Sequence, residues 1–130
     1  PVHSVDELYS QAQVISLHIP ATPETKQSIN HDLLAKMPKG ALLVNTARKE
    51  VIHEDGLIQL MQERPDFRYI TDIMPASDIK MKELFEGRYF STPKKMGAQT
   101  AEANINAGIA AANQIVDYLK NGNERFRLNK

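Results

Sequence analysis

The chain has 130 residues, of which 42% are hydrophobic and 25% are charged, as expected for one folded α/β domain and not for a disordered or membrane-spanning chain. Its 16 basic residues balance its 16 acidic residues, which predicts neither a nucleic-acid partner nor an anionic membrane partner. The lack of cysteine excludes disulfides, thiol catalysis and thiolate metal sites; we expect no metal centre and a cytoplasmic protein.

Four short apolar runs, rich in β-branched or aromatic residues, alternate with helical patterns along the chain. The runs cover residues 14–19, 41–45, 69–72 and 89–91. This alternation predicts βα units and an α/β fold with a parallel sheet.

Short helices are predicted from capping residues and apolar spacing. One begins at Ser4, which has a capping-box partner three residues later, and another is capped by Asn30. A third follows His53, with acidic residues in its first turn, and a fourth lies around residues 81–85.

The longest predicted helix runs from about Thr100 to Asn121 and ends at Gly122. Its apolar side chains recur every three or four residues, so they share one face that we expect to be packed. In the tail that follows, Phe126 and Leu128 are candidate anchors. The residues of the shared face are Ile105, Ile109, Ala112, Val116 and Leu119.

Charged side chains follow three of the predicted strands, where the ligands of an open parallel sheet bind. Arg48 comes soon after the run 41–45 and can hold a carboxylate through two parallel hydrogen bonds. Asp72 ends the third run as a hydrogen-bond acceptor, suited to an amide. Lys94 and Lys95 place two cations after the fourth run.

The order of these segments resembles the NAD-binding domain of D-2-hydroxyacid dehydrogenases. The most specific block is Val44-Asn45-Thr46-Ala47-Arg48 followed by Val51-Ile52, and the resemblance covers nearly the whole chain. It implies the second half of a Rossmann-like doubly wound parallel sheet. It also implies three parts: residues 1–99 in the NAD-binding domain, residues 100–122 as a long helix that crosses back to the substrate domain, and a tail at 123–130.

The same resemblance implies NAD as the cofactor and a small 2-hydroxyacid or 2-oxoacid as the substrate. Arg48 would bind the substrate carboxylate and polarise the 2-oxo or 2-hydroxy group. Asp72 would contact the nicotinamide carboxamide, His18 and Pro20 would lie against the adenosine side, and Ala47 would lie beside the nicotinamide ring. Further residues expected at the cofactor are Thr46, Arg48, Gly97 and Ala98.

Two positions depart from the family pattern. The family has a glutamate five residues after the aspartate that matches Asp72, whereas this chain has Ser77 there and Asp78 next to it. The family also has a histidine in a Pro-His-x-Gly segment. Here Lys95 replaces the histidine if the segments are aligned on Met-Gly-Ala-Gln-Thr, and Lys94 replaces it if they are aligned on Thr-Pro.

The two departures have a common physical explanation. A histidine needs a carboxylate to orient it and to stabilise its cation, whereas an ammonium group is already protonated and needs no such partner. We therefore predict that Lys95 or Lys94 is the general acid/base, as the resemblance to 3-phosphoglycerate dehydrogenases without a regulatory domain also implies. Two exposed lysines with no role are the alternative.

The function that follows is NAD-dependent oxidation of a D-2-hydroxyacid, with 3-phosphoglycerate converted to 3-phosphohydroxypyruvate in serine biosynthesis, by a full-length homodimer. A glyoxylate or hydroxypyruvate reductase and a non-catalytic, NAD-sensing binding protein are the alternatives. The chain contains no Gly-x-Gly-x-x-Gly segment to hold the cofactor pyrophosphate. We therefore expect these 130 residues alone to be inactive.

Overall fold

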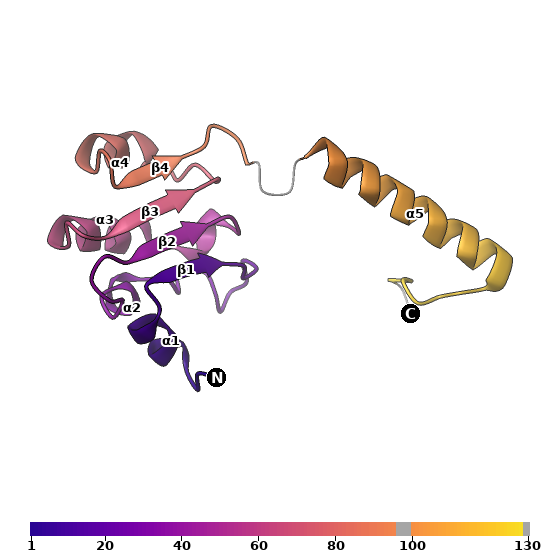
Figure 1. Ribbon diagram of the computed structural model, residues 1–130, viewed down its shortest axis with the longest axis horizontal. Coiled ribbons are helices and arrows are strands. Elements are labelled where there is room, and N and C mark those ends of the chain that lie inside the picture. Colours follow the sequence, from indigo (N-terminus) through magenta and orange to yellow (C-terminus); the bar gives the residue numbers. More distant parts are fainter. Residues whose placement is uncertain (96–99, 129–130) are drawn as a thin grey trace. The chain divides into compact units, whose positions relative to one another are not determined.

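The structure, a computed structural model, describes residues 1–95 and 100–128. The chain divides into two compact units, Pro1–Lys95 and Met96–Lys130. The first unit contains the sheet and the short helices, and the described part of the second contains one long helix and the tail (Figure 1).

The strands of the first unit form one parallel sheet in the order β1-β2-β3-β4. Their register pairs Leu17 with Asn45, Asn45 with Thr71 and Thr71 with Ser91, so the carboxyl ends of the strands meet at one edge. The prediction of a parallel sheet is confirmed, although β1 ends two residues before the predicted boundary. The strands are β1 (Val14–Leu17), β2 (Leu42–Asn45), β3 (Arg68–Thr71) and β4 (Tyr89–Ser91).

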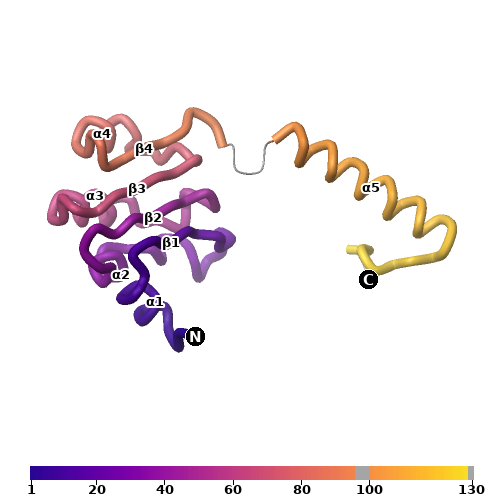
Figure 2. The backbone as a smooth tube through the Cα atoms, viewed as in Figure 1, coloured from indigo at the N-terminus to yellow at the C-terminus, as the bar shows by residue number. Residues whose placement is uncertain are grey.

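The helices of the first unit cover one face of the sheet (Figure 2). Alternate strand residues point into this layer, where Leu43 and Tyr69 are buried. The third predicted helix buries the apolar side chains of Leu57, Leu60 and Met61 against the sheet layer. The helical elements are α1 (Val5–Gln11), α2 (His31–Leu34), the 3-10 helix η1 (Lys49–Val51), α3 (Glu54–Glu63) and α4 (Asp78–Leu84).

The predicted N-caps Ser4 and Asn30 are confirmed in part, and His53 is a further N-cap that the sequence did not predict. The Asn30 side chain accepts from the backbone N–H of Leu33 at 3.0 Å, and His53 Nδ1 accepts from Gly56. Ser4 accepts from the N–H of Glu7, but the Glu7 carboxylate binds the N–H of the residue before Ser4, so the capping box is not reciprocal.

The start of α4 differs from the sequence prediction, and α2 is short. Helix α2 ends at Leu34, and tighter i to i+3 hydrogen bonds carry the chain to Met37. Helix α4 begins at Asp78 rather than at residue 81, because the Asp78 side chain is buried and held by β4. That contact is tertiary, so the local sequence does not reveal it.

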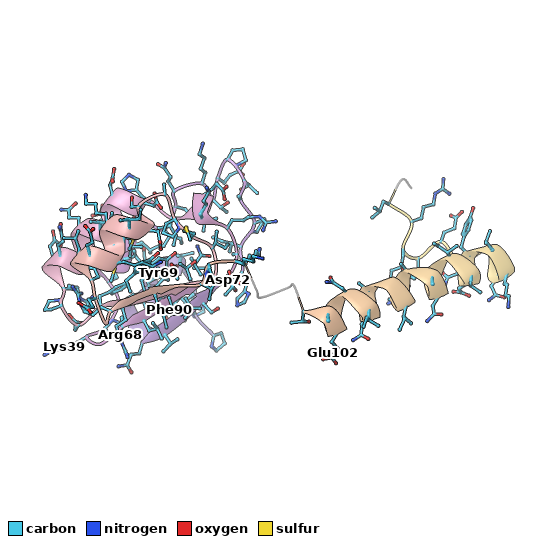
Figure 3. All side chains as sticks on the ribbon, turned by 90° about the horizontal axis from the view of Figure 1, so that it is seen from above. Lys39, Arg68, Tyr69, Asp72, Phe90 and Glu102 are labelled. Carbon is cyan, nitrogen blue, oxygen red and sulfur yellow. The ribbon has the colours of Figure 1, made fainter. Side chains whose placement is uncertain are left out.

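The opposite face of the sheet is not covered by residues of the first unit. Figure 3 labels Tyr69 and Phe90, which belong to the two faces: Tyr69 is 2% exposed and Phe90 is 59% exposed. Val14 and Ile70 are also exposed. A doubly wound fold covers both faces of its sheet, and the described residues of this unit supply the cover for one.

Helix α5 (Ala101–Asn121) has the predicted boundaries. Thr100 Oγ1 accepts from the N–H of Ala103, and Gly122 ends the helix in the left-handed conformation at φ 67°. Within its own unit the apolar stripe of α5 is exposed and Leu128 is fully exposed, so the described residues of this unit do not anchor the tail through Leu128. Among the described residues no helix is long and apolar enough to cross a membrane.

Candidate functional site

A hollow of about 500 Å³ lies at the carboxyl edge of the sheet, beyond the ends of β1 and β2. We call it the strand-end hollow. It is a plausible size for part of a small-molecule site, and its wall mixes apolar and cationic side chains. Its lining residues are His18, Ile19, Pro20, Ala21, Thr46, Ala47, Arg48 and Lys95.

Two cations meet on one oxygen in this hollow. Arg48 Nη1 donates to the backbone oxygen of Ala47 at 3.2 Å, and Lys95 Nζ donates to the same oxygen at 3.2 Å. The guanidinium and the amine are therefore at most twice that distance apart. An oxyacid bound in the hollow could contact both groups at once.

The structure separates the two lysines that the sequence left open. Lys95 is half-buried and lines the strand-end hollow, whereas Lys94 is exposed and does not line it. The Lys94 backbone oxygen accepts from Thr92 Oγ1 at 2.8 Å. The geometry therefore favours the alignment on Met-Gly-Ala-Gln-Thr.

Asn45 holds the turn that carries Arg48, a role that the sequence did not predict. Asn45 ends β2 and is fully buried. Its Oδ1 accepts from the N–H of Ala47 and its Nδ2 donates to the oxygen of Arg48, both at 3.0 Å. A buried amide at a strand end, just before a cation, is the signal that could have identified it.

The predicted cofactor residues are placed as follows. His18, Pro20, Thr46 and Ala47 all line the strand-end hollow, and the His18 ring lies 2.9 Å from Ser16 Oγ. Asp72 is buried behind this edge, where its N–H donates to the oxygen at the end of β2 at 3.3 Å. Two further predicted positions, Gly97 and Ala98, lie outside the described residues.

Asp78, next to the position of the family glutamate, has a carboxylate that is fully occupied by contacts within the fold. Asp78 Oδ1 accepts from Tyr89 OH at 2.6 Å and from Ser91 Oγ at 2.5 Å, and Oδ2 pairs with Lys82 at 2.8 Å. Burial alone would raise the pKa of Asp78, but the hydrogen bonds from Lys82, Ser91 and Tyr89 outweigh it and hold that pKa below its ordinary value. Ser77, at the family glutamate position, makes no side-chain cap bond.

A parallel sheet with a polar hollow at its carboxyl edge is the arrangement of nucleotide-binding α/β proteins. The NAD-binding domain model of the D-isomer specific 2-hydroxyacid dehydrogenases matches residues 1–93. The chain therefore belongs to the D-isomer specific 2-hydroxyacid dehydrogenase family, and its predicted cofactor, NAD, is the cofactor of that domain.

No group of three metal-ligating side chains occurs in residues 1–95 and 100–128.

Several relatives have been identified by function. The chain is 34% identical over 134 residues to D-3-phosphoglycerate dehydrogenase of Haemophilus influenzae, covering 98% of this chain and 32% of that protein. It is 34% identical over 119 residues to hydroxypyruvate reductase of Thermotoga maritima, covering 88% of this chain and 39% of that protein. The chain thus spans less than half the length of these relatives.

A solved structure is more similar. The crystal structure of 3-phosphoglycerate dehydrogenase of Entamoeba histolytica with NAD+ bound has 52% sequence identity and a TM-score of 0.86. The match covers 99% of this chain and 42% of that one. The predicted α/β Rossmann-like fold and family are confirmed.

Proposed function

We propose that the full-length protein is an NAD-dependent dehydrogenase that oxidises 3-phosphoglycerate to 3-phosphohydroxypyruvate. The observation that carries this proposal is the meeting of Arg48 and Lys95 on the Ala47 oxygen. A guanidinium and an amine in one hollow support this proposal, because acid/base chemistry on a hydroxyacid needs one group to bind the carboxylate and another to transfer the proton.

Each cation has a separate task in this mechanism. Arg48 binds the substrate carboxylate and turns the 2-hydroxy group toward Lys95, since the guanidinium can form two parallel hydrogen bonds. The Lys95 amine accepts the hydroxyl proton during oxidation, and its ammonium form returns the proton to the oxo oxygen during reduction. Ala47 holds the amine in place through its backbone oxygen.

The residues of the hollow fit the cofactor. Pro20 and Ala47 offer small apolar surface for a flat ring, and His18 and Thr46 offer polar groups for a ribose or an amide. We propose that these four residues and Asp72 contact NAD, which supplies the hydride acceptor when bound. Contacts of Gly97 and Ala98 with NAD are proposed on the family resemblance alone.

The charge of the hollow supports an anionic substrate. Arg48 and Lys95 contribute two cations, and no acidic side chain is among the described residues that line it. The relatives named as 3-phosphoglycerate dehydrogenases favour the phosphorylated hydroxyacid, while the relative named as a hydroxypyruvate reductase keeps that smaller substrate as the alternative. The cytoplasmic location and the homodimer stay predictions.

A non-catalytic, NAD-sensing protein fits the site less well. Loss of the family histidine and glutamate would suit such a role. A non-catalytic role does not explain, however, why Lys95 and Arg48 donate to the same backbone oxygen in the hollow. The two functions differ in whether the complete protein turns over substrate.

The test is steady-state kinetics on the full-length protein, with Lys95→Ala compared with Lys94→Ala. Because Lys95 transfers the proton, we expect its removal to lower kcat by roughly 10² to 10⁴-fold. Lys94→Ala is the matched control, and we expect kcat to stay within about twofold because Lys94 is exposed.

Arg48→Lys should raise KM for the hydroxyacid as well as lower kcat, because an ammonium group cannot form the paired hydrogen bonds of a guanidinium. Equal rates in the Lys95 and Lys94 variants would refute the assignment of the general acid/base. A complete protein that binds NAD without turnover would refute the dehydrogenase itself.

A further inference from the structure

We infer that Asn45 is a positioning residue for the general acid/base, because its buried amide fixes the turn whose oxygen holds Lys95. The inference rests on the proposed function only for its effect on catalysis. Its structural part, that Asn45 determines where the Lys95 amine sits, can be tested without any turnover.

The geometry around Asn45 supports this role. The side chain is fully buried, and both ends of its amide are used within the next three residues. Oδ1 accepts a hydrogen bond from the N–H of Ala47, before the peptide that links Ala47 to Arg48. Nδ2 donates to the backbone oxygen of Arg48, after that peptide. The peptide that carries the Ala47 oxygen lies between these two bonds, so its orientation is fixed from both directions.

The turn is also tied to the neighbouring strand. The backbone oxygen of Asn45 accepts from Thr71 Oγ1 at 2.8 Å and from the N–H of Asp72 at 3.3 Å. Asn45 therefore cannot move without disturbing β3. A rigid strand end is a better support for a reacting group than a free loop, because a small displacement of such a group has a large effect on rate.

The turn that Asn45 fixes is hydrogen-bonded in turn to both cations. The Ala47 oxygen accepts from Lys95 Nζ and from Arg48 Nη1, each at 3.2 Å. If the peptide between Ala47 and Arg48 rotates, both cations lose their common acceptor together. Asn45 touches neither the amine nor the guanidinium, so it acts through the turn.

The variants are Asn45→Ser and Asn45→Asp in the full-length protein. Asn45→Asp replaces the donating amide with a carboxylate of the same size, and Asn45→Ser replaces it with a shorter, uncharged hydroxyl, so neither variant keeps both hydrogen bonds of the amide. A result common to both therefore reports the turn and not the charge. Asn45→Asp also covers the case in which the smaller side chain prevents folding.

The control for a general loss of stability is Arg88→Met. Arg88 is half-buried and donates to the backbone oxygens of Met61 and Arg64 at 3.0 Å. It precedes β4 and therefore lies at the amino edge of the sheet. The variant loses buried hydrogen bonds without a change at the strand-end hollow.

The readout is the rate at which an amine-reactive acylating reagent modifies Lys95, measured by peptide mass spectrometry with Lys94 as the internal reference. In both Asn45 variants we expect Lys95 to react roughly fivefold faster, the factor expected when a group loses one hydrogen bond. Lys94 should keep its rate. In Arg88→Met, both lysines should keep their rates.

Kinetics provide the second readout. In the Asn45 variants kcat should fall on the order of 10²-fold while KM for NAD changes little, because the amine is misplaced by a small distance. Unchanged Lys95 labelling in both Asn45 variants would overturn the inference. Faster labelling of Lys95 in a protein without turnover would uphold the positioning and refute the proposed function instead.

Discussion

At the scale of single residues, the two departures from the family pattern have different consequences. Lys95 sits in the strand-end hollow, at the oxygen that also binds Arg48. Asp78 lies next to the position of the missing glutamate, yet its carboxylate is occupied by Lys82 and by two residues of β4. The nearby acid thus links α4 to β4 and is not a substitute for the lost glutamate.

The Asp78 carboxylate should make stability depend on pH. Its pKa is held below the ordinary value, so its contribution is complete above the unfolded pKa of about 3.9 and is lost as pH falls through the folded pKa. Tyr89→Phe removes the 2.6 Å hydrogen bond to this carboxylate and should lower the free energy of unfolding by about 1.5 to 3 kcal/mol at pH 7.

Denaturant unfolding at pH 7 and near pH 3 measures this effect. The difference between Tyr89→Phe and the parent protein should shrink at the lower pH, because protons then compete with the hydrogen bonds that the Asp78 carboxylate accepts. Tyr118→Phe, on the exposed surface of α5, is the matched control and should leave stability unchanged at both values. A loss that is the same at both pH values would show that the charge of Asp78 plays no part.

At the scale of elements, capping residues and periodicity predicted most of the first unit. All four strands were located, and the two predicted N-cap residues, Ser4 and Asn30, act as predicted. The error is at the start of α4, where a tertiary contact to β4 decides the boundary. Gly56 illustrates the limit: a side chain there would meet His53 Nδ1 at 2.8 Å and the N–H of His31 at 2.9 Å, a close approach that no local pattern reveals.

A pH-dependent contact joins α2 to α3. His31 Nε2 lies 2.7 Å from the Glu63 carboxylate, and this hydrogen bond raises the pKa of His31. A raised histidine pKa contributes stability that is complete below the unfolded value of about 6.5 and is lost as pH rises through the folded pKa. Glu63→Gln should therefore destabilise the protein at pH 6 more than at pH 9.

Thermal unfolding at these two pH values checks the prediction. Glu83→Gln removes a carboxylate from the exposed surface of α4 and serves as the control. Its effect should not change between pH 6 and pH 9. If the effect of Glu63→Gln instead grows with pH, the protonated histidine is not what holds the two helices.

At the scale of the whole molecule, each of the two units has an apolar surface that its own described residues do not cover. In the first unit it is the face of the sheet with Val14, Ile70 and Phe90, and in the second it is the stripe of α5 that includes Ile105 and Leu119. Apolar periodicity predicts that a face will be buried, but it carries no information on what buries it. For this reason the packing of α5 could not be predicted from the sequence.

The candidate site was predicted in part. The sequence selected Arg48 by its place after a strand and narrowed the acid/base to two lysines. It could not choose between the lysines, because the choice depends on which side chain turns into the hollow. It also missed Asn45, since a single asparagine at a strand end has many possible roles.

The most direct test of the account is a crystal structure of the full-length protein with NAD and a 2-oxoacid. We predict that the guanidinium of Arg48 will bind the carboxylate of the oxoacid and that Lys95 Nζ will lie within hydrogen-bonding distance of the 2-oxo oxygen. An oxoacid bound to Arg48 with the Lys95 amine turned away, or bound outside the strand-end hollow, would contradict the account.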